Sequence, residues 1–280
     1  MEKVIRKNDL TDIQKKLFLM LKWFHSFCRE NDLRYFVLGG TMLGAVRHEG
    51  FIPWDDDVDV GMPRKDYEIF LELCKGKFFG NYVVETIDTD QSDFFYGYSK
   101  IYDISTTLVE SARHNVKRGI YMDLFPLDGV CDSKNDIPKM FRPIYWRYNL
   151  LMARNCAYSK KRKWYKNLSI FLGRLIPNLL VNNKKLMTSI DKLCRKNDYD
   201  DCRYIANYLG NWGINEIVPK KVMGKPELYH FEDTMVYGAE NYDAYLTSLY
   251  GNWRQLPPKE KRITHHEYVY IKLDKSFLEK

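Results

Sequence analysis

Apolar and polar positions follow helical or strand-like periods along most of the 280-residue chain. Between Thr11 and Asn31 an apolar residue recurs every three or four positions, which predicts an amphipathic helix with its apolar side toward the core. Thr11 and Gln14 have the spacing of a capping box, so this helix should begin at Thr11. His25 lies next to the apolar stripe and is expected to have a structural role.

Short apolar runs alternate with further helical patterns and predict a mixed α/β (α+β) fold. The expected strands are residues 34–38, 57–60, 82–87, 97–103, 119–125 and 203–209, with a hairpin over 228–231 and 234–237. The expected helices are residues 42–47 with Thr41 as the N-cap, a helix that starts at Pro63, three helices over 137–158, 164–181 (broken near Pro177) and 184–196, and one over 242–250.

The stretch over residues 38–62 carries the main candidate chemistry. Asp57 and Asp59 are two positions apart on an expected strand, so both carboxylates point to one face while the neighbouring valines enter the core. Two adjacent carboxylates repel each other, and a divalent cation such as Mg²⁺ turns the pair into a binding site. The alternative is a solvated acidic loop, which the flanking apolar residues disfavour. A calcium loop is disfavoured because its glycine and its final glutamate are missing.

A double glycine, Gly39-Gly40, follows the strand expected at 34–38 and precedes a turn of helix. Glycine lets backbone N–H groups approach a phosphate closely, and a helix N-terminus favours an anion. Arg47 would add a bidentate phosphate contact. The glycine pair alone is weak evidence, and neither a P-loop nor a GxGxxG fingerprint is present.

Asp123 lies between aromatic residues on the strand expected at 119–125, where an unpaired charge is unfavourable. A neighbouring metal ion or a substrate hydroxyl would explain the carboxylate. The structural alternative is a salt bridge to Arg113 or Arg118. Asp128, a few residues further on, is expected in a turn.

Composition indicates a soluble globular protein, with 45% hydrophobic and 29% charged residues. The six cysteines form no CxxC pair and no zinc spacing, which favours buried thiols in a reducing compartment. The first ten residues lack a signal-peptide core, and no run of about 18 apolar residues is present. We therefore expect a cytoplasmic protein.

Residues 134–196 contain 16 Lys and Arg but two acidic residues, although the whole chain carries a net charge of only +7. Aromatic residues are interleaved with the basic ones. A peripheral contact with an anionic membrane, or with a lipid-linked glycan, is our first interpretation. Solvated basic helix faces are the second. Nucleic-acid binding is the third, because no known motif accompanies the charge.

The order of strand, Gly-Gly, helix and Asp-x-Asp resembles the nucleotidyltransferase superfamily. The text GGTMLGAVRHEGFIPWDDDVDVGMPRKDYEIF resembles the LicD family in particular, and the similarity continues at 100–103, 119–129 and 250–262 and at His265-His266. The resemblance implies a nucleotidyltransferase-like mixed sheet flanked by helices. It also implies a catalytic core over 1–132, a basic helical insertion over 133–200 and a C-terminal α/β part over 201–280 that completes the substrate site.

The resemblance also implies roles for individual residues. It makes Asp57, Asp59 and Asp123 the catalytic residues and the ligands of Mg²⁺ or Mn²⁺. It assigns substrate contacts to Gly39, Gly40, Thr41, Arg47, Lys100 and His265. From the residues alone, Lys100 lies between two tyrosines and favours a surface position with an extended side chain. Two adjacent histidines on a strand face opposite sides, so His265 and His266 are not expected to share one metal ion.

LicD-like proteins are similar to enzymes that transfer phosphocholine from CDP-choline to a sugar hydroxyl of a teichoic acid, lipopolysaccharide or capsule and release CMP. The related fukutin branch transfers other alcohol phosphates, so glycerol phosphate or ribitol phosphate from a CDP-linked donor is the close alternative. A true nucleotidyltransferase and a non-catalytic membrane- or RNA-binding module remain open. A quaternary ammonium needs an aromatic cage, but the many aromatic residues of the chain, including Trp54, Tyr98, Trp212 and Trp253, do not single one out.

Overall fold

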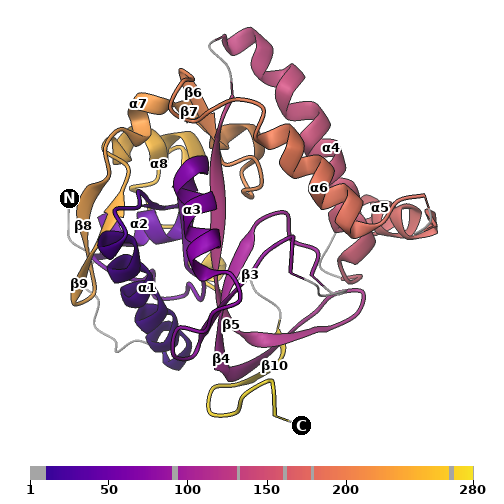
Figure 1. The fold of residues 1–280 in the computed structure, drawn as a ribbon, viewed down its shortest axis with the longest axis horizontal. Coiled ribbons are helices and arrows are strands. Elements are labelled where there is room, and N and C mark those ends of the chain that lie inside the picture. Colours follow the sequence, from indigo (N-terminus) through magenta and orange to yellow (C-terminus); the bar gives the residue numbers. More distant parts are fainter. Residues whose placement is uncertain are drawn as a thin grey trace.

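The computed structural model describes residues 11–89, 94–130, 133–159, 163–177, 180–264 and 268–279. It has the mixed α/β architecture that the sequence predicts (Figure 1). The helices are α1 (Asp12–Glu30), α2 (Gly39–His48), α3 (Arg64–Cys74), α4 (Ile137–Asn155), α5 (Trp164–Leu175), α6 (Asn183–Cys194), α7 (Lys220–Met223) and α8 (Tyr242–Tyr250), with 3-10 turns η1 (Lys134–Asp136), η2 (Gly213–Glu216) and η3 (Lys259–Lys261).

The strands form one large curled sheet and one separate hairpin. They are β1 (Phe36–Val37), β2 (Asp59–Pro63), β3 (Tyr82–Glu85), β4 (Ser99–Glu110), β5 (Val116–Gly129), β6 (Tyr204–Ala206), β7 (Ile217–Pro219), β8 (Glu227–Phe231), β9 (Thr234–Gly238) and β10 (Tyr268–Lys272). The main path runs β1-β2-β5-β4-β10, and β3 pairs with β4. The end of β5 pairs with β6, which pairs with β7, while β8 and β9 form the hairpin.

Strand β5 organises the sheet because four features depend on it. It is parallel to β2 on one side and antiparallel to β4 on the other. Its C-terminal end continues into the pairing with β6, and both α1 and α3 pack against it. In Figure 1 these two helices and α2 lie on one side of β5, while α4, α5 and α6 form a separate group on the other side.

The first helix has the N-terminus that its sequence predicts. Thr11 and Gln14 form both hydrogen bonds of a capping box, with N···O distances of 3.1 and 3.2 Å. His25 is buried, and its Nδ1 lies 2.7 Å from the Tyr35 hydroxyl. Burial lowers the pKa of His25, which therefore stays neutral. Its structural role is confirmed.

Element boundaries differ from the prediction where long-range pairing extends or shortens a local pattern. Strands β4 and β5 are longer than expected, since they pair along most of their length with a register shift between Asp103 and Leu108. Strand β6 is shorter than expected, and α5 ends at Leu175, close to the break predicted near Pro177. Strands β7 and β10 and the short helix α7 were not predicted from the sequence.

Asp128 is not in a turn, as the sequence predicted, but in strand β5, where it is buried. The guanidinium of Arg64 binds both of its carboxylate oxygens, at 2.7 Å from Nε and 2.6 Å from Nη2. Arg64 also reaches Asp191 of α6 at 2.9 Å. One buried arginine therefore joins the sheet, α3 and the helical group. A second ion pair between Arg195 and Glu68, at 3.0 Å, supports the same junction.

The described helices include none long and apolar enough to cross a bilayer.

Replacing Arg64 with Met should lower the free energy of unfolding by about 3–5 kcal/mol, because Asp128 then remains buried without its cation. Urea denaturation at pH 7 measures the change. The double variant Arg64→Met/Asp128→Leu should recover much of the loss, since it buries no uncompensated charge. Lys15→Met is the control, because its pair with Asp12 is exposed and should contribute less than about 1 kcal/mol. Equal losses for Arg64→Met and Lys15→Met would contradict the assignment.

Candidate active site

The backbone of Asp59 is fixed where β1, α2 and β2 meet. Its N–H donates to the Thr41 hydroxyl at 2.9 Å, and its carbonyl accepts the Leu38 N–H at 2.9 Å. The prediction that Thr41 caps the helix is therefore wrong: α2 begins at Gly39 with Leu38 as its N-cap. Gly39 permits the earlier start because it adopts the left-handed conformation, with φ +48°. The Thr41 side chain is thereby released to hold the acidic strand.

The parallel pairing of β2 with β5 places Asp59 directly opposite Asp123. A further backbone bond, from the Asp123 N–H to the Val58 carbonyl at 2.9 Å, fixes this register. Because parallel neighbours point their side chains to the same face, the two carboxylates lie side by side. The sequence predicts that Asp59 and Asp123 come together, and the register of β2 and β5 pairs them.

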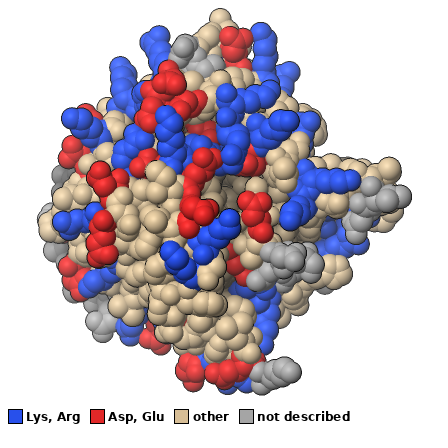
Figure 2. Space-filling model, viewed as in Figure 1, with Lys and Arg blue, Asp and Glu red and all other residues tan. Residues whose placement is uncertain are grey.

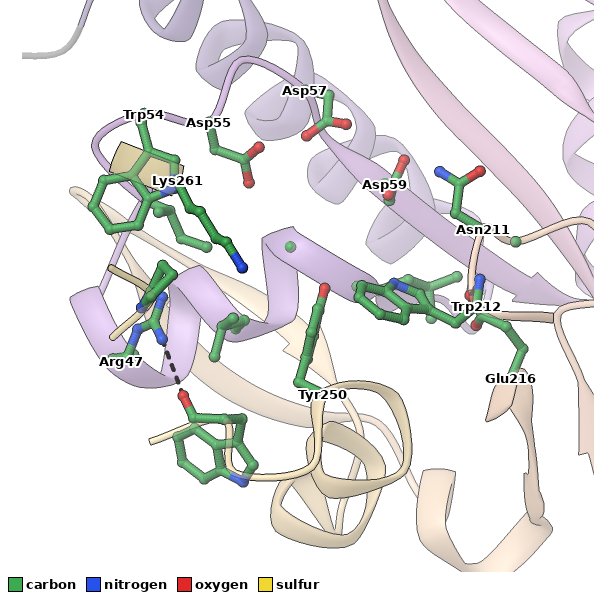
Figure 3. A pocket seen from close by; sticks show the side chains of 18 of the residues that line it. Arg47, Trp54, Asp55, Asp57, Asp59, Asn211, Trp212, Glu216, Tyr250 and Lys261 are labelled. Carbon is green, nitrogen blue, oxygen red and sulfur yellow. Dashed lines mark hydrogen bonds between the residues drawn. The ribbon is translucent and has the colours of Figure 1, made fainter. Parts of the chain in front are cut away.

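A cavity of about 780 Å³ opens beside this junction. Figure 3 shows it between α2, the acidic loop and the segments around Trp212 and Tyr250. Of the predicted site residues, those that line it are Gly39, Gly40, Arg47, Asp57 and Asp59. Thr41, Lys100 and Asp123 are not among its lining residues and lie in the adjoining layer. His265 and His266 lie outside the described residues.

The acidic loop before β2 is held in place from α1. The side-chain amide of Gln14 donates to the carbonyls of Ile52 and Asp55, at 3.2 and 2.8 Å. Asp55, Asp57 and Asp59 then all line the cavity. The sequence analysis did not assign Asp55 a role, although it belongs to the same acidic run. Its close approach to α2 explains the second glycine, because a Cβ on Gly40 would lie 2.7 Å from Asp55 Oδ2.

The electrostatics of this group favour a cation. Burial raises the pKa of Asp59 well above its usual range, and the nearby Asp57, Asp123, Asp55 and Glu216 raise it further. The described His, Cys, Asp and Glu side chains form no cluster of three that would constitute a complete metal site. Mg²⁺ and Mn²⁺ suit oxygen ligands, and Mg²⁺ commonly combines one or two carboxylates with water and substrate phosphates. The chemistry of the donor set therefore fits such an ion, with Asp57 and Asp59 as the residues that would hold it.

The two ends of α2 offer different contacts to a ligand. The Gly39 N–H already donates to the Tyr245 hydroxyl at 3.2 Å, which leaves the other first-turn N–H groups as possible donors to a phosphate. Arg47 lies near the C-terminal end, where its Nη1 donates to the Trp253 carbonyl at 3.0 Å. Seven residues of helix separate it from Gly40, a rise of roughly 10 Å. These two contacts would therefore serve different groups of one extended ligand.

Lys261 is a cation that the sequence analysis did not single out. It comes from η3, is exposed, and lines the cavity with its amine directed toward the acidic loop and α2 (Figure 3). The segment 250–262 was part of the family resemblance, but no local pattern indicated which of its basic residues faces the cleft.

Lys100 is buried, so the interpretation as a surface lysine is wrong. Its Nζ lies 2.8 Å from Asp123 Oδ1, 3.3 Å from the ring centroid of Tyr121 and 4.1 Å from that of Tyr96. Both tyrosine hydroxyls donate to Glu110 at 2.6 Å. Lys100 is therefore the ion-pair partner of Asp123.

The two arginines proposed for Asp123 have other positions. Arg118 pairs with the buried Glu85 at 3.0 Å, and the Arg113 backbone N–H donates to the Asn155 carbonyl. Burial raises the pKa of Asp123, and the charge and hydrogen bond of Lys100 oppose that rise. The sequence could not reveal this pairing, because the register between β4 and β5 determines it.

Glu216 also lines the cavity and was missed by the sequence analysis. It is buried in η2, accepts the Trp212 N–H at 3.4 Å, and has its pKa raised to about 7 by burial. A single glutamate between Asn215 and Ile217 gives no local signal of this position.

A mixed sheet in which a Gly-Gly helix start adjoins an Asp-x-Asp strand, with a further aspartate on the neighbouring strand, defines a transferase domain of the nucleotidyltransferase type. Comparison with known proteins specifies the class further. Residues 32–135 match the family model described as LicD/FKTN/FKRP, nucleotidyltransferase domain. Residues 32–135 therefore carry a domain of the LicD family, and the chain is a transferase.

Three relatives illustrate the extent of the similarity. The lipopolysaccharide cholinephosphotransferase LicD of Haemophilus influenzae is 28% identical over 272 residues, which cover 95% of this chain and 100% of that protein. An uncharacterized protein of Rickettsia prowazekii is 42% identical over 62 residues, 22% of this chain and 23% of its own length. The human ribitol 5-phosphate transferase FKRP is 53% identical over 34 residues, 12% of this chain and 7% of that protein. The fukutin-related part of the resemblance is thereby confirmed.

Replacing Lys100 with Met should destabilise the protein by about 3–5 kcal/mol at pH 8, because Asp123 loses its buried cation. In the variant, the pKa of Asp123 in the folded state should rise further above its value in the unfolded state, so the free energy of unfolding falls as the pH increases. Urea denaturation between pH 5 and pH 8 should show the smallest loss near pH 5. Lys77→Met, at an exposed site, is the control. A loss that is independent of pH would contradict a charge-compensating role.

Glu216 should make the free energy of unfolding fall as the pH rises. The pKa of Glu216 is about 7 in the folded state and the usual 4.5 in the unfolded state. Between these two pH values the unfolded state therefore loses the proton while the folded state keeps it, and this stabilises the unfolded state. The shift corresponds to roughly 3 kcal/mol. Glu216→Gln, which can still accept the Trp212 N–H, should flatten the fall in unfolding free energy between pH 5 and pH 8 in the absence of divalent cations. The exposed Glu227→Gln should leave the profile unchanged, and an unaltered profile for Glu216→Gln would rule out the raised pKa.

Proposed function

We propose that the protein transfers phosphocholine from CDP-choline to a hydroxyl of a cell-surface glycan, such as a teichoic acid, a lipopolysaccharide or a capsule, and releases CMP. The observation that carries the proposal is the convergence of Asp57 and Asp59 with the N-terminal turn of α2 in one cavity. The extended similarity to a cholinephosphotransferase supports the choice of alcohol.

In this reaction the acceptor hydroxyl oxygen forms a bond to the phosphorus that carries choline, and the bond from that phosphorus to the CMP oxygen breaks. Asp123, which lies beside Asp59 in the sheet, would accept the hydroxyl proton, since burial makes it a stronger base than an exposed aspartate. Lys100 orients its carboxylate. Asp57 and Asp59 would hold Mg²⁺ or Mn²⁺, which when bound neutralises the diphosphate and the charge on the leaving oxygen. The alternative role for Asp123 is that of a further metal ligand.

The remaining cleft residues suit the rest of an extended donor. The first-turn N–H groups of α2 would donate hydrogen bonds to one phosphate, and Lys261 and Arg47 offer cations further along the cleft. Among the aromatic candidates, Trp54 and Trp253 already stack with arginines, at 5.6 and 4.3 Å, and Tyr98 is buried. Trp212 is partly exposed in the cavity, with its ring 4.7 Å from that of Tyr250. This pair is our choice for contact with the quaternary ammonium.

The acceptor would be a lipid-linked glycan, and the enzyme would act in the cytoplasm at the inner face of the membrane. Glycerol phosphate or ribitol phosphate is the alternative cargo, and the short similarity to a ribitol 5-phosphate transferase supports keeping it. A true nucleotidyltransferase would instead leave the nucleotide on its acceptor. No nucleic-acid partner is proposed.

A ligand panel with Mg²⁺ tests the donor: CDP-choline, CDP-ethanolamine, CDP-glycerol, CDP-ribitol, CTP and ATP. A ligand that binds only the folded state raises the melting temperature, so CDP-choline should give the largest shift. Asp57→Asn/Asp59→Asn should abolish that shift and reduce CMP release by roughly a hundredfold or more. Asp56→Asn is the matched control, because Asp56 lies in the same run but is not among the residues that line the cavity.

Each outcome separates the candidates. A shift with CDP-ribitol or CDP-glycerol alone would replace choline with that alcohol. A shift with CTP or ATP alone would favour a nucleotidyltransferase. No response to any ligand, or equal effects of the double variant and Asp56→Asn, would overturn the proposed site.

A further inference from the structure

Helix α5 carries a stripe of large apolar side chains on its solvent side. The five residues are exposed to between 45% and 76% of their surface, and we call them the α5 stripe: Trp164, Leu168, Phe171, Leu172 and Leu175. Their spacings of four, seven, eight and eleven positions place all of them within about 100° of the helix circumference. An apolar stripe of this kind normally faces a core, and here it faces away from one.

The opposite side of α5 is the side that packs, which fixes the direction of the stripe. Ile170 is buried, and a Cβ on Gly173 would lie 2.9 Å from the Ala153 Cβ of α4. Arg154 of α4 donates from Nη1 to the Gly173 carbonyl at 3.0 Å. Rotating α5 to bury the stripe would break these contacts. In Figure 1 the helix projects from the α4–α6 group, away from the sheet.

The surroundings of the stripe are basic. Lys163 and Lys166 are exposed at its N-terminal end, and the preceding residues 160–162 of the sequence are also basic. Of the two acidic residues between 134 and 196, Asp191 is already paired with Arg64 and Arg195. Figure 2 shows Lys, Arg and uncharged residues, with little Asp or Glu, where α5 projects. Trp146 of α4 is also 70% exposed, and tryptophan is enriched at membrane–water interfaces.

We propose that α5 lies in the interface of an anionic phospholipid bilayer, with the α5 stripe inserted at the acyl boundary and the lysines against lipid headgroups. A helix of this length, about 18 Å, suits an in-plane position. The combination of outward apolar side chains and a basic rim favours an anionic lipid surface over a protein partner. The inference rests on the proposed function in one respect: a lipid-linked acceptor would reach the enzyme at this membrane surface. The binding itself requires no substrate.

Flotation of the full chain with vesicles tests the inference. Binding is expected to vesicles of phosphatidylglycerol and phosphatidylcholine, to be much weaker with phosphatidylcholine alone, and to weaken as NaCl is raised. Trp164→Ser/Phe171→Ser should lower the partition coefficient by roughly tenfold or more. Lys163→Glu/Lys166→Glu should lower it only for the anionic vesicles. Leu228→Ser is the matched control, because this residue is exposed to 50% on β8, outside the helical group.

Three results would overturn the inference: no binding, equal binding to neutral and anionic vesicles, or equal effects of the stripe variant and Leu228→Ser. Sedimentation velocity tests the alternative that a second copy of the chain binds the α5 stripe. A dimer that Trp164→Ser/Phe171→Ser dissociates, without vesicle binding by the wild type, would assign the stripe to a second copy of the chain. The thermal shift with CDP-choline should be the same in the stripe variant and the wild type, so failure of membrane binding and failure of the proposed donor site are distinguishable.

Discussion

Two carboxylates on adjacent parallel strands can share a partly buried site only if positive charge lies beside them, and this constraint shapes the centre of the protein. The register of β2 and β5 places Asp59 next to Asp123. Lys100 supplies a cation to Asp123 from within the sheet. Asp57 and Asp59 face the cavity, which Arg47 and Lys261 also line, and a bound cation would add positive charge there. The fold thus supplies the charge beside Asp123 from within the sheet and presents the other two carboxylates to a ligand.

The tyrosines around Lys100 hold that internal charge in place. Tyr96 and Tyr121 lie against its ammonium group, and their hydroxyls are fixed by Glu110. Movement of Lys100 toward a phosphate would give up these contacts and leave Asp123 uncompensated, which is unfavourable in a buried site. The geometry therefore favours Lys100 as a positioning residue, and under the proposed function the α2 N-terminus and the cations that line the cleft would bind phosphate.

The local sequence pattern predicted the features that depend on residues close in the sequence. It failed for residues whose position depends on contacts with distant segments. The capping box of α1 and the burial of Val58 and Val60 on either side of Asp59 are short-range features, and both appear as expected, although the strand begins at Asp59 and leaves Asp57 in the preceding loop. Asp128 looked like a turn residue because its partner, Arg64, is far away in the sequence. Glu216 had no distinguishing neighbours, since its raised pKa comes from burial by the assembled fold. Thr41 had a plausible local role, which its hydrogen bond to Asp59 replaced.

Periodicity also predicted α5 without predicting which way it faces. Removing an apolar stripe from water lowers the free energy whether a protein core or a bilayer covers it. The stripe itself therefore does not distinguish the two. The direction comes from small contacts on the other side, at Ile170 and Gly173. The ion pairs of Arg64 with Asp191 and of Arg195 with Glu68 then connect the helical group to α3 and the sheet. A bilayer that bound α5 would therefore orient the cavity as well, because these contacts transmit the position of the helices to the strands that carry the aspartates.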